Sequence, residues 1–430
     1  MKRICGLETE LGVIPKNAAP LFLECSEYVV REQTGKDTDK RTHLRNGSQM
    51  YLDVGHAEIA SAECSNPLDL TRIDQANMRM ISELAERHGI HIYRNNHDAH
   101  HNCFGCHENY YLSKMPEEKA DLLVNRAIER MNAFLITRIL YSGAGMFDDS
   151  GFLLSPRAKY TKEIIGHASL DPKPIASLRD NEPFSKDGIR LHLTCGDSLM
   201  SEFANYLKIG TAWIVVSLVE KRFIPSRLII NDPISFLAKV NREGIAATTI
   251  IQGTTYTALE IQKEYLGLAH DFFSKHPSLA DPVSKDVMKK WEFILNILEK
   301  EPEKLFRYVD WATKLFLYNL ASSQEPVDKK QFDLDYHLLS SQGKYYLARR
   351  NSLVTTLFSE QELTNASFFP PVDTRASYRT WKLRQLFHLG AKIEHASWTL
   401  ISYRPSSGEL ITNDFIDPYA CFPESKSKEL

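Results

Sequence analysis

Two glutamates placed two residues apart, Glu8 and Glu10, interrupt a short apolar stretch near the N-terminus. Residues i and i+2 of a β-strand project from the same face, so both carboxylates would point the same way. Two like charges on one face of a buried strand are costly unless a cation lies between them. A divalent cation that also carries phosphate meets this need. An edge strand with a hydrated face explains the pair equally well, and the pair alone leaves both interpretations open.

Four further segments place ionisable side chains in strand-like stretches. Tyr51 and Asp53 share one face of such a stretch, and Arg190 and His192 share one face of another. A lone histidine or glutamate of this kind is more often a satisfied core residue or part of a hydrated surface. Together, however, the segments supply oxygen and imidazole ligands for Mg²⁺ or Mn²⁺ and guanidiniums for phosphate oxygens. The remaining members are His56, Glu58, Glu63, His107, Glu108, Asn109, Tyr110, Arg179 and Asp180.

These segments predict a two-metal site for a triphosphate. The sequence contains neither the Gly-x-x-x-x-Gly-Lys-Ser/Thr phosphate loop nor a Gly-x-Gly-x-x-Gly run after a strand. A bound nucleotide would therefore have to be held through metal ions on a sheet lined with carboxylates.

The elements that must position these residues are strands early in the chain and helices later. This order favours an α+β fold over a doubly wound parallel sheet. The run Phe368-Phe369-Pro370-Pro371 predicts a boundary between a catalytic domain over residues 1–367 and a small C-terminal domain over residues 368–430. The expected strands cover residues 3–14, 49–54, 57–64, 91–95, 189–195 and 397–404. The expected helices cover residues 21–32, 69–88, 116–141, 197 or 198 to 220, and 375–389, with a loop-rich stretch over 155–188. Residues 233–322 are expected to be mostly helical, with breaks near Gly253, Pro277 and Pro302.

Composition excludes several classes of protein. A hydrophobic content of 43% and a charged content of 25% are those of an ordinary globular protein. The formal net charge of −3 argues against a general nucleic-acid binder or a basic membrane-surface protein. The longest apolar run, from Thr211 to Glu220, is too short to span a bilayer. Because no apolar signal segment follows Lys2 and Arg3, we expect a cytoplasmic location.

The seven cysteines are scattered and predict no disulfide framework. Cys103-Phe104-Gly105-Cys106-His107 fits the haem-attachment pattern, and His97, His100 and His101 nearby suggest zinc. Covalent haem attachment needs export, and a structural zinc site usually pairs two Cys-x-x-Cys knuckles, of which this chain has one. Both interpretations are therefore disfavoured.

Five strings resemble, in order, the Pup ligase and depupylase family, which is related to glutamine synthetase and other carboxylate-amine ligases. They are GLETELG, LRNGSQMYLDVGHAEIASAEC, NNHDAHHNCFGCHENYY, RLHLTCGDSLMSE and ASWTLISY, and the resemblance runs from residue 3 to about residue 418. It implies a curved antiparallel sheet that cradles ATP and divalent metals, flanking helices and a small C-terminal domain.

The resemblance also implies two or more Mg²⁺ or Mn²⁺ ions. It assigns Glu8, Glu58 and His107 to one ion and Glu10 and His192 to another, and it adds Glu63, in the same acidic wall, as a further metal ligand. On this assignment His107 is a ligand, and the neighbouring cysteines are bystanders.

The other roles that the resemblance implies concern catalysis and nucleotide binding. Asp53 is similar to the family's catalytic aspartate, and Arg179 and Arg190 are similar to phosphate-contacting arginines. Tyr51 and Trp398 are expected in the nucleotide pocket.

The implied reaction is ATP-dependent ligation of a glutamate side chain of Pup, or of a Pup-like peptide, to a lysine of a target protein. The short stretch over residues 15–44 and the string from Gly105 to Tyr110 favour the ligase branch. Substrate-side strings such as His56-Ala57-Glu58-Ile59 depart from the family pattern, so another peptide glutamate stays open as the substrate. A depupylase or amidase and a nucleotide phosphohydrolase are the alternatives, followed by a non-catalytic interaction protein.

Overall fold

The structure, a computed structural model, describes most of the chain. The described residues are 2–15, 41–53, 55–98, 102–114, 119–167, 172–178, 183–185, 188–405 and 408–421. The helix expected over residues 21–32 lies outside these ranges, as do Arg179, His100 and His101.

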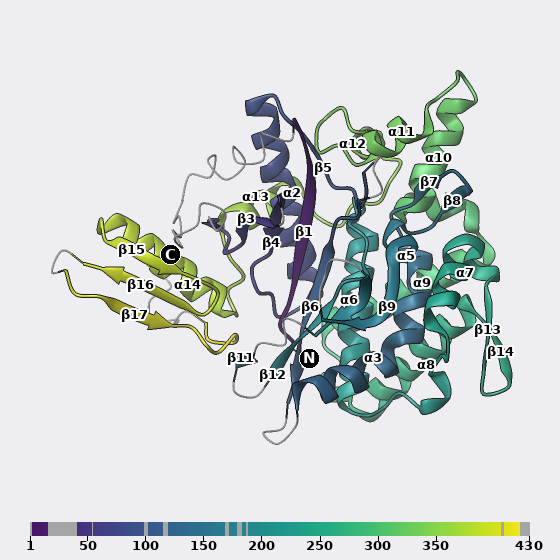
Figure 1. The fold of residues 1–430 in the computed structure, drawn as a ribbon, viewed down its shortest axis with the longest axis horizontal. Helices are drawn as coiled ribbons and strands as arrows, with labels where there is room; N and C mark the ends of the chain where they lie inside the picture. Colours follow the sequence, from purple (N-terminus) through teal and green to yellow (C-terminus); the bar gives the residue numbers. More distant parts are fainter. Residues whose placement is uncertain are drawn as a thin grey trace.

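The elements alternate early and become helical later, as expected for an α+β fold (Figure 1). The strands are β1 (Cys5–Ile14), β2 (Thr42–His43), β3 (Gln49–Asp53), β4 (His56–Ala60), β5 (His91–Tyr93), β6 (Cys106–Ser113), β7 (Met146–Asp148), β8 (Gly151–Leu153), β9 (Thr161–Gly166), β10 (Lys173–Ser177), β11 (Pro183–Ser185), β12 (Gly188–Leu193), β13 (Thr248–Ile251), β14 (Thr254–Thr257), β15 (Lys392–Ala396), β16 (Leu400–Arg404) and β17 (Ile411–Asp414). The helices are α2 (Pro67–His88), α3 (Ala120–Thr137), α4 (Ile139–Ser142), α5 (Pro156–Tyr160), α6 (Glu202–Glu220), α7 (Pro233–Glu243), α8 (Ala258–Lys275), α9 (Pro282–Lys300), α10 (Asp310–Ser322), α11 (Lys329–Tyr336), α12 (Lys344–Arg350), α13 (Glu360–Phe368) and α14 (Arg375–His388).

A ten-stranded sheet organises the first half of the chain. Its main path runs β2-β3-β4-β1-β6-β12-β10-β9, with β5 paired to β1 and β11 paired to β12. The pairs between β2 and β12 along this path are antiparallel, as predicted. The β9–β10 pair is parallel, so the complete sheet is mixed.

The stretch over residues 155–188, expected to be loop-rich, contributes α5, β9, β10 and β11 to this structure. Prolines usually indicate loops, but three of the prolines in this stretch occupy positions that helices and strands tolerate. Pro156 opens α5, Pro183 opens β11, and Pro174 lies where the β9–β10 register shifts.

A layer of helices packs behind the sheet, with α6 at its centre (Figure 1). Every residue of α6 from Glu202 to Val219 is buried, and its neighbours in the core come from α3, α8 and α9. The fully buried Trp213 donates a hydrogen bond from Nε1 to the carbonyl of Arg3, just before β1. The strand that carries the two N-terminal glutamates is thereby held against the core.

Helix α6 begins later than the sequence predicts. Ser201 is its N-cap and accepts a hydrogen bond from the backbone N–H of Ala204. Asp197, one of the two expected caps, is buried and accepts backbone N–H groups of Ala144 and Arg157 instead. Because distant backbone donors bind this carboxylate, the expected cap at residue 197 or 198 is wrong.

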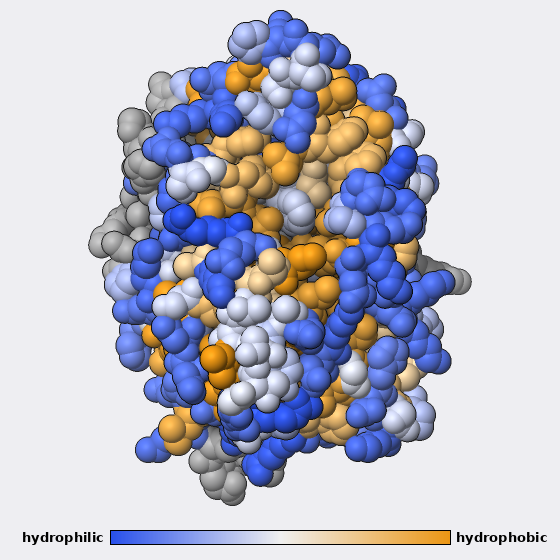
Figure 2. All heavy atoms as spheres, turned by 90° about the vertical axis from the view of Figure 1, so that its right-hand side faces the viewer, coloured by the Kyte–Doolittle hydropathy of each residue, from blue (hydrophilic) through white to orange (hydrophobic). Residues whose placement is uncertain are grey.

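The hairpin of β13 and β14 lies at the break near Gly253 that interrupts the expected helical pattern, although the two strands themselves were not predicted. Gln252 and Gly253 have φ angles of 48° and 83°, the left-handed pair of a tight hairpin turn. β-Branched residues on both sides of the turn favour strands. Figure 2 shows the helical side of the molecule, where apolar and polar surface are mixed.

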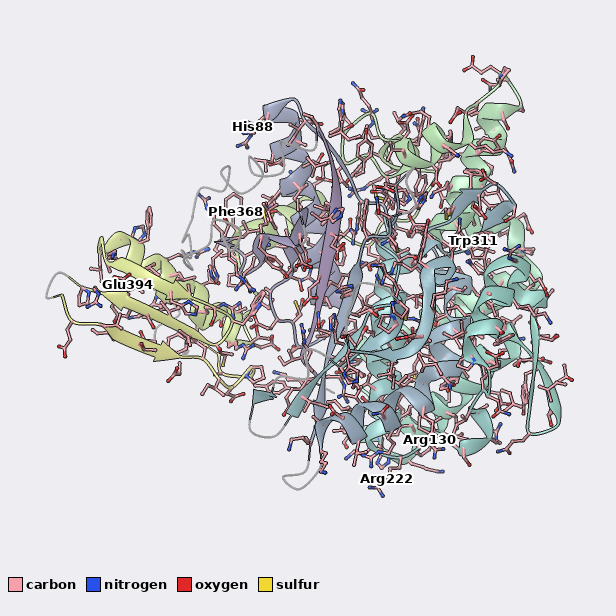
Figure 3. All side chains as sticks on the ribbon, in the orientation of Figure 1. His88, Arg130, Arg222, Trp311, Phe368 and Glu394 are labelled. Carbon is pink, nitrogen blue, oxygen red and sulfur yellow. The ribbon has the colours of Figure 1, made fainter. Side chains whose placement is uncertain are left out.

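Helix α14 and the three-stranded sheet of β15, β16 and β17 form a C-terminal unit (Figure 1). Figure 3 shows Glu394 in this unit, on the opposite side of the molecule from Trp311 in α10. The unit has its own apolar cluster, made by Leu383, Leu386, Ala396, Ile401, Tyr403 and Phe415. No helix in the described ranges is long and apolar enough to cross a membrane.

Candidate active site

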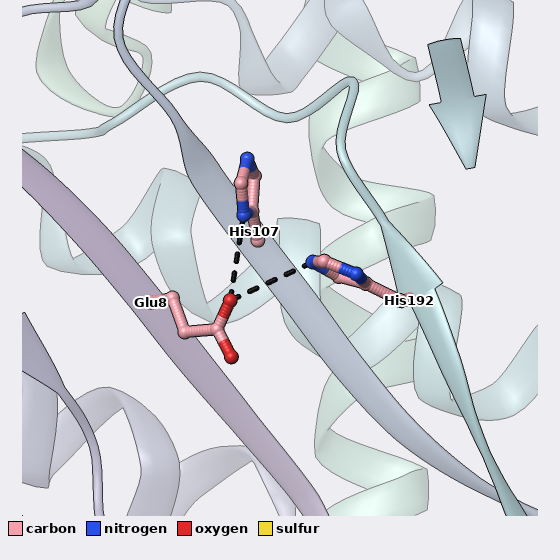
Figure 4. Close-up of side chains that lie close together, drawn as sticks. All are labelled: Glu8, His107 and His192. Atoms are coloured by element: carbon pink, nitrogen blue, oxygen red, sulfur yellow. Dashed lines mark ion pairs between the residues drawn. The ribbon is translucent and has the colours of Figure 1, made fainter. Parts of the chain in front are cut away.

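The first group of site residues is Glu8 with His107 and His192 (Figure 4). Glu8 and His107 are direct cross-strand partners on β1 and β6, and His192 lies on the next strand, β12. Oε2 of Glu8 lies 3.4 Å from Nδ1 of His107 and 3.5 Å from Nε2 of His192. One carboxylate and two imidazoles thus converge on one point, which is a donor set that a divalent cation accepts.

The second group is Glu10, Asp53 and Glu58, whose carboxylate oxygens also lie within 4.8 Å of one another. Glu10 and Glu58 are direct cross-strand partners on β1 and β4, and Asp53 comes from the neighbouring β3. The phenol of Tyr51, which is the partner of Glu58 on β3, donates a hydrogen bond to Oε1 of Glu58. Three oxygen ligands on adjacent strands suit a hard cation such as Mg²⁺.

This grouping differs from the division that the resemblance implied. Glu58 joins Glu10 rather than Glu8, and His192 joins Glu8 rather than Glu10. The strand register is the reason, because it sets Glu8 opposite His107 and Glu10 opposite Glu58.

The two groups differ in charge compensation. Burial opposes ionisation of Glu8, but the Arg190 guanidinium and hydrogen bonds from both histidines hold its pKa well below the usual value. Burial raises the pKa of Glu58 well above the usual value, and the charge of Glu8 adds to the rise. The second group therefore concentrates negative charge that a cation would relieve.

Arg190 is positioned from β12 beside the first group. Its Nη1 donates hydrogen bonds to Oε1 of Glu8 at 3.0 Å and to Oδ1 of Asn109 at 3.2 Å. Arg179, the other expected phosphate contact, lies outside the described residues.

Glu63 reaches the same pocket but belongs to neither group of possible metal ligands. Arg375 Nε donates to its Oε1 at 2.6 Å, and Arg379 donates to both carboxylate oxygens at 2.8 and 2.7 Å. Burial opposes ionisation, yet the two arginines lower the pKa of Glu63 to about 2. Its place in the structure is that of an anchor for α14, which differs from the ligand role predicted for it.

Apart from Glu10 and Arg379, the site residues described above line one cavity of about 550 Å³. Trp398 and Thr399 of the C-terminal unit form one wall, and Arg379 stacks 4.9 Å from the Trp398 ring centroid. The expected nucleotide-pocket residues Tyr51 and Trp398 therefore border the same space. The further lining residues are Ile4, Cys5, Gly6, Leu7, Glu8, Arg41, Asp53, Glu58, Ala60, Ser61, Glu63, His107, Asn109, Tyr111, Arg190, His192 and Arg375.

Gly105 is a site residue that the sequence reasoning missed. A Cβ atom at this position would lie 2.5 Å from Nε2 of His107 and 2.8 Å from Oε1 of Glu10. The glycine thus leaves room where the two groups approach each other. Its place two residues before the possible ligand His107 was a usable signal in the sequence.

The cysteines beside Gly105 lie apart from both groups. Cys106 is buried within 3.4 Å of the Lys208 ammonium, and Cys103 lies 3.2 Å from a guanidinium nitrogen of Arg157. The ammonium and guanidinium groups beside the two sulfur atoms disfavour a further cation such as zinc at this position.

Comparison with known proteins gives this site a family. The family model described as "Pup-ligase protein" matches residues 23–402. The chain belongs to the Pup-ligase family. Among the relatives in this family, a Pup–protein ligase of Bifidobacterium longum (strain NCC 2705) is 30% identical over 98% of this chain and 92% of its own length. A Pup–protein ligase of Xylanimonas cellulosilytica is 32% identical over 88% of each chain.

Solved structures agree on the fold. The ligase in a crystal structure of the complex between prokaryotic ubiquitin-like protein Pup and its ligase PafA matches with a TM-score of 0.84 at 24% identity. That match covers 99% of this chain and 91% of the other. The Pup ligase PafA in complex with ADP matches with a TM-score of 0.77 over 96% of this chain and 92% of the other. The Pup-ligase fold thus extends through the C-terminal unit.

Proposed function

We propose that this protein is an ATP-dependent ligase that joins a glutamate side chain of Pup, or of a Pup-like peptide, to a lysine of a target protein. Membership of the Pup-ligase family carries the proposal, and relatives of similar length are named Pup–protein ligases. Glu8, Asp53 and Glu58, both histidines and Arg190 border one cavity, and Glu10 lies beside Asp53 and Glu58.

The donor set fits divalent metal ions. Glu8, His107 and His192 would hold one ion, and Glu10 and Glu58 would hold another, with Asp53 beside them as the carboxylate that is left for proton transfer. The raised pKa of buried Glu58, with Glu8 contributing to the rise, supports this fit. When bound, such ions neutralise phosphate charge and orient the triphosphate. Mg²⁺ is the ion we expect, because most of these ligands are oxygens.

The chemistry would proceed in two steps. A carboxylate oxygen of the substrate glutamate attacks the γ-phosphorus of ATP, ADP leaves, and an acyl phosphate forms. The lysine amine then attacks the acyl carbon, phosphate leaves, and the nitrogen loses a proton as the isopeptide bond forms. Arg190, beside Glu8, is placed to neutralise charge on the transferring phosphoryl group.

Asp53 is the group we assign to the proton. A lysine ammonium must lose a proton before it can attack, and a carboxylate at the edge of the second group can accept it. Asp53 is suited to this part because it is on β3, at the edge of the three-carboxylate group, and it lines the cavity.

The two alternatives on the same fold are not favoured. A depupylase would use the same pocket to cleave an amide, and a phosphohydrolase would pass the phosphoryl group to water. The named relatives at 30% and 32% identity are ligases.

The test is a product analysis. Purified protein is incubated with ATP and Mg²⁺, with and without a Pup-like peptide and a lysine-bearing protein, and ADP, phosphate and conjugate are measured. We expect conjugate, with ADP and phosphate in equal amounts, only when peptide and acceptor are both present. Phosphate release at the same rate with and without the peptide would identify the protein as a nucleotide phosphohydrolase. Cleavage of a preformed conjugate without ligation would establish the amidase.

We also propose that residues 368–430 act as a small domain that closes the nucleotide side of the cavity. The separate apolar cluster of the C-terminal unit and the contribution of Trp398 to the cavity wall support this division.

A further inference from the structure

Arg41 is a cavity residue outside every motif that the sequence singled out. It immediately precedes β2, is half-buried, and lines the cavity together with Tyr51 and Glu58. A half-buried guanidinium that lines a site for a polyanion is suited to binding an anion, and not only to keeping the surface soluble.

The position of Arg41 is fixed by stacking. Its guanidinium carbon lies 4.9 Å from the ring centroid of Tyr51, within the range of a cation–π contact. The Tyr51 phenol is itself hydrogen-bonded to Glu58 in the second group of possible metal ligands. Stacking uses the face of the guanidinium and leaves its edge of five N–H donors available.

The other arginines of the cavity wall are engaged by carboxylates. Arg190 pairs with Glu8, and Arg375 pairs with Glu63. Within the described part of the chain, Arg41 makes no ion pair, and its stacking partner is Tyr51. Arg41 is therefore the cavity cation with the most capacity to bind an external anion.

The sheet order places Arg41 across the site from Arg190. Arg41 adjoins β2 at one end of the β2-β3-β4-β1-β6-β12 path, and Arg190 lies on β12 at the other. The second group, and Glu8 and His107 of the first, lie on the strands between them. A polyphosphate held over these strands would be flanked by two guanidiniums, one from each side.

We propose that Arg41 binds the terminal phosphate of the nucleoside triphosphate and neutralises it during phosphoryl transfer. This inference rests on the proposed function, which supplies the triphosphate. A terminal phosphate offers several oxygens and close to two negative charges, which match the bidentate edge of arginine. The substrate glutamate carries one carboxylate and is the weaker match.

The test compares nucleotides that differ in their terminal phosphate. A non-hydrolysable ATP analogue and ADP, each with Mg²⁺, are titrated by calorimetry into wild type, Arg41→Ala, Arg41→Gln and Arg41→Lys without peptide. Losing a charge-assisted contact should weaken analogue binding about 10- to 100-fold in the Ala and Gln variants. We expect a smaller loss for ADP and partial recovery in the Lys variant.

Arg45→Ala is the matched control. Arg45 lies on the same segment and stacks 5.3 Å from the ring centroid of Phe368, but it is not among the lining residues. Its loss should leave analogue affinity unchanged. Thermal melting of each variant checks folding, and the Gln and Lys variants retain much of the side-chain stem if Arg41→Ala is unstable.

Three results would overturn the inference. They are wild-type analogue affinity in the Ala and Gln variants, an equal loss for analogue and ADP, or, when ligation kinetics of the same variants are measured, an effect confined to the KM for peptide. The last would place Arg41 against the glutamate carboxylate. Wild-type protein that binds the analogue but forms no conjugate would overturn the ligase proposal. The effect of the Arg41 variants on analogue binding could still be measured in that case. Wild-type protein that binds neither nucleotide would overturn both.

Discussion

Glu58 and Glu63 lie five residues apart, are both buried and border the same cavity, yet their surroundings are opposite. Glu63 is bound by two arginines, which hold its pKa near 2. Glu58 faces other carboxylates, and burial together with their charge raises its pKa. A carboxylate with counter-charges in the fold contributes to stability, whereas one without them is suited to a cation from outside.

The same contrast occurs across strand β6. His107 points into the site, while its neighbour Glu108 points to the opposite face and forms a buried ion pair with Arg138 at 2.5 Å. Burial opposes ionisation of Glu108, but Arg138 lowers its pKa. The alternation of the strand thus separates a functional residue from a structural one at adjacent positions.

The largest effect on activity is expected at Asp53, in the group without counter-charges. Asp53→Asn should reduce turnover about 10²- to 10⁴-fold, because the general base is lost while the size of the side chain is kept. Its melting temperature should match that of wild type, and steady-state kinetics with calorimetry of nucleotide binding measures both effects. Normal turnover would remove Asp53 from the mechanism.

The largest effect on stability is expected at Glu63. Glu63→Ala leaves the buried guanidiniums of Arg375 and Arg379 without their carboxylate, which should cost about 3–5 kcal/mol in the free energy of unfolding. Urea denaturation of the metal-free protein measures this loss. A variant as stable as wild type would show that the ion pairs of Glu63, which Glu58 lacks, do not contribute to the free energy of unfolding.

The opposite result is expected at Glu58. Glu58→Gln relieves repulsion among neighbouring carboxylates, so the metal-free protein should gain on the order of 1 kcal/mol. Nucleotide affinity in Mg²⁺ should fall at the same time, and calorimetry with and without Mg²⁺ tests this. If the metal-free variant is less stable than wild type, the carboxylates of the second group do not repel one another in the way described.

The smallest effect is the pH dependence of the Glu63 anchor. The folded pKa near 2 lies below the ordinary value of 4.5, so the unfolded chain binds a proton first as the pH falls. The stabilisation is fully present above pH 4.5 and declines as the pH falls toward 2. The stability difference between wild type and Glu63→Gln should therefore shrink across this window, as measured by denaturation at several pH values. A stability difference that does not change with pH would show that the contribution of Glu63 comes from packing and not from its charge.

Local patterns predicted most of the elements that carry the site. The helix expected over residues 69–88 is observed as Pro67–His88, and the one expected over 375–389 is observed as Arg375–His388. Period-two alternation also placed Glu8 and Glu10 on one face, because alternation is a property of a single strand.

The sequence alone did not predict which residues of distant segments lie opposite one another. Whether Glu8 meets Glu58 or His192 depends on strand register, which a single sequence leaves unspecified. The two arginines that bind Glu63 lie 312 and 316 positions away along the chain. The carboxylate looked like a ligand because its counter-charges come from a different part of the fold.

The long separation between Glu63 and its arginines makes the cavity depend on a segment that is translated long after the sheet. Until α14 emerges from the ribosome, Glu63 lacks both guanidiniums and the cavity lacks the wall that contains Trp398. A chain that stops at residue 367 should therefore bind nucleotide poorly even where its sheet has formed, which calorimetry on that truncated protein would measure. The cavity should therefore be complete only in molecules that include the C-terminal unit.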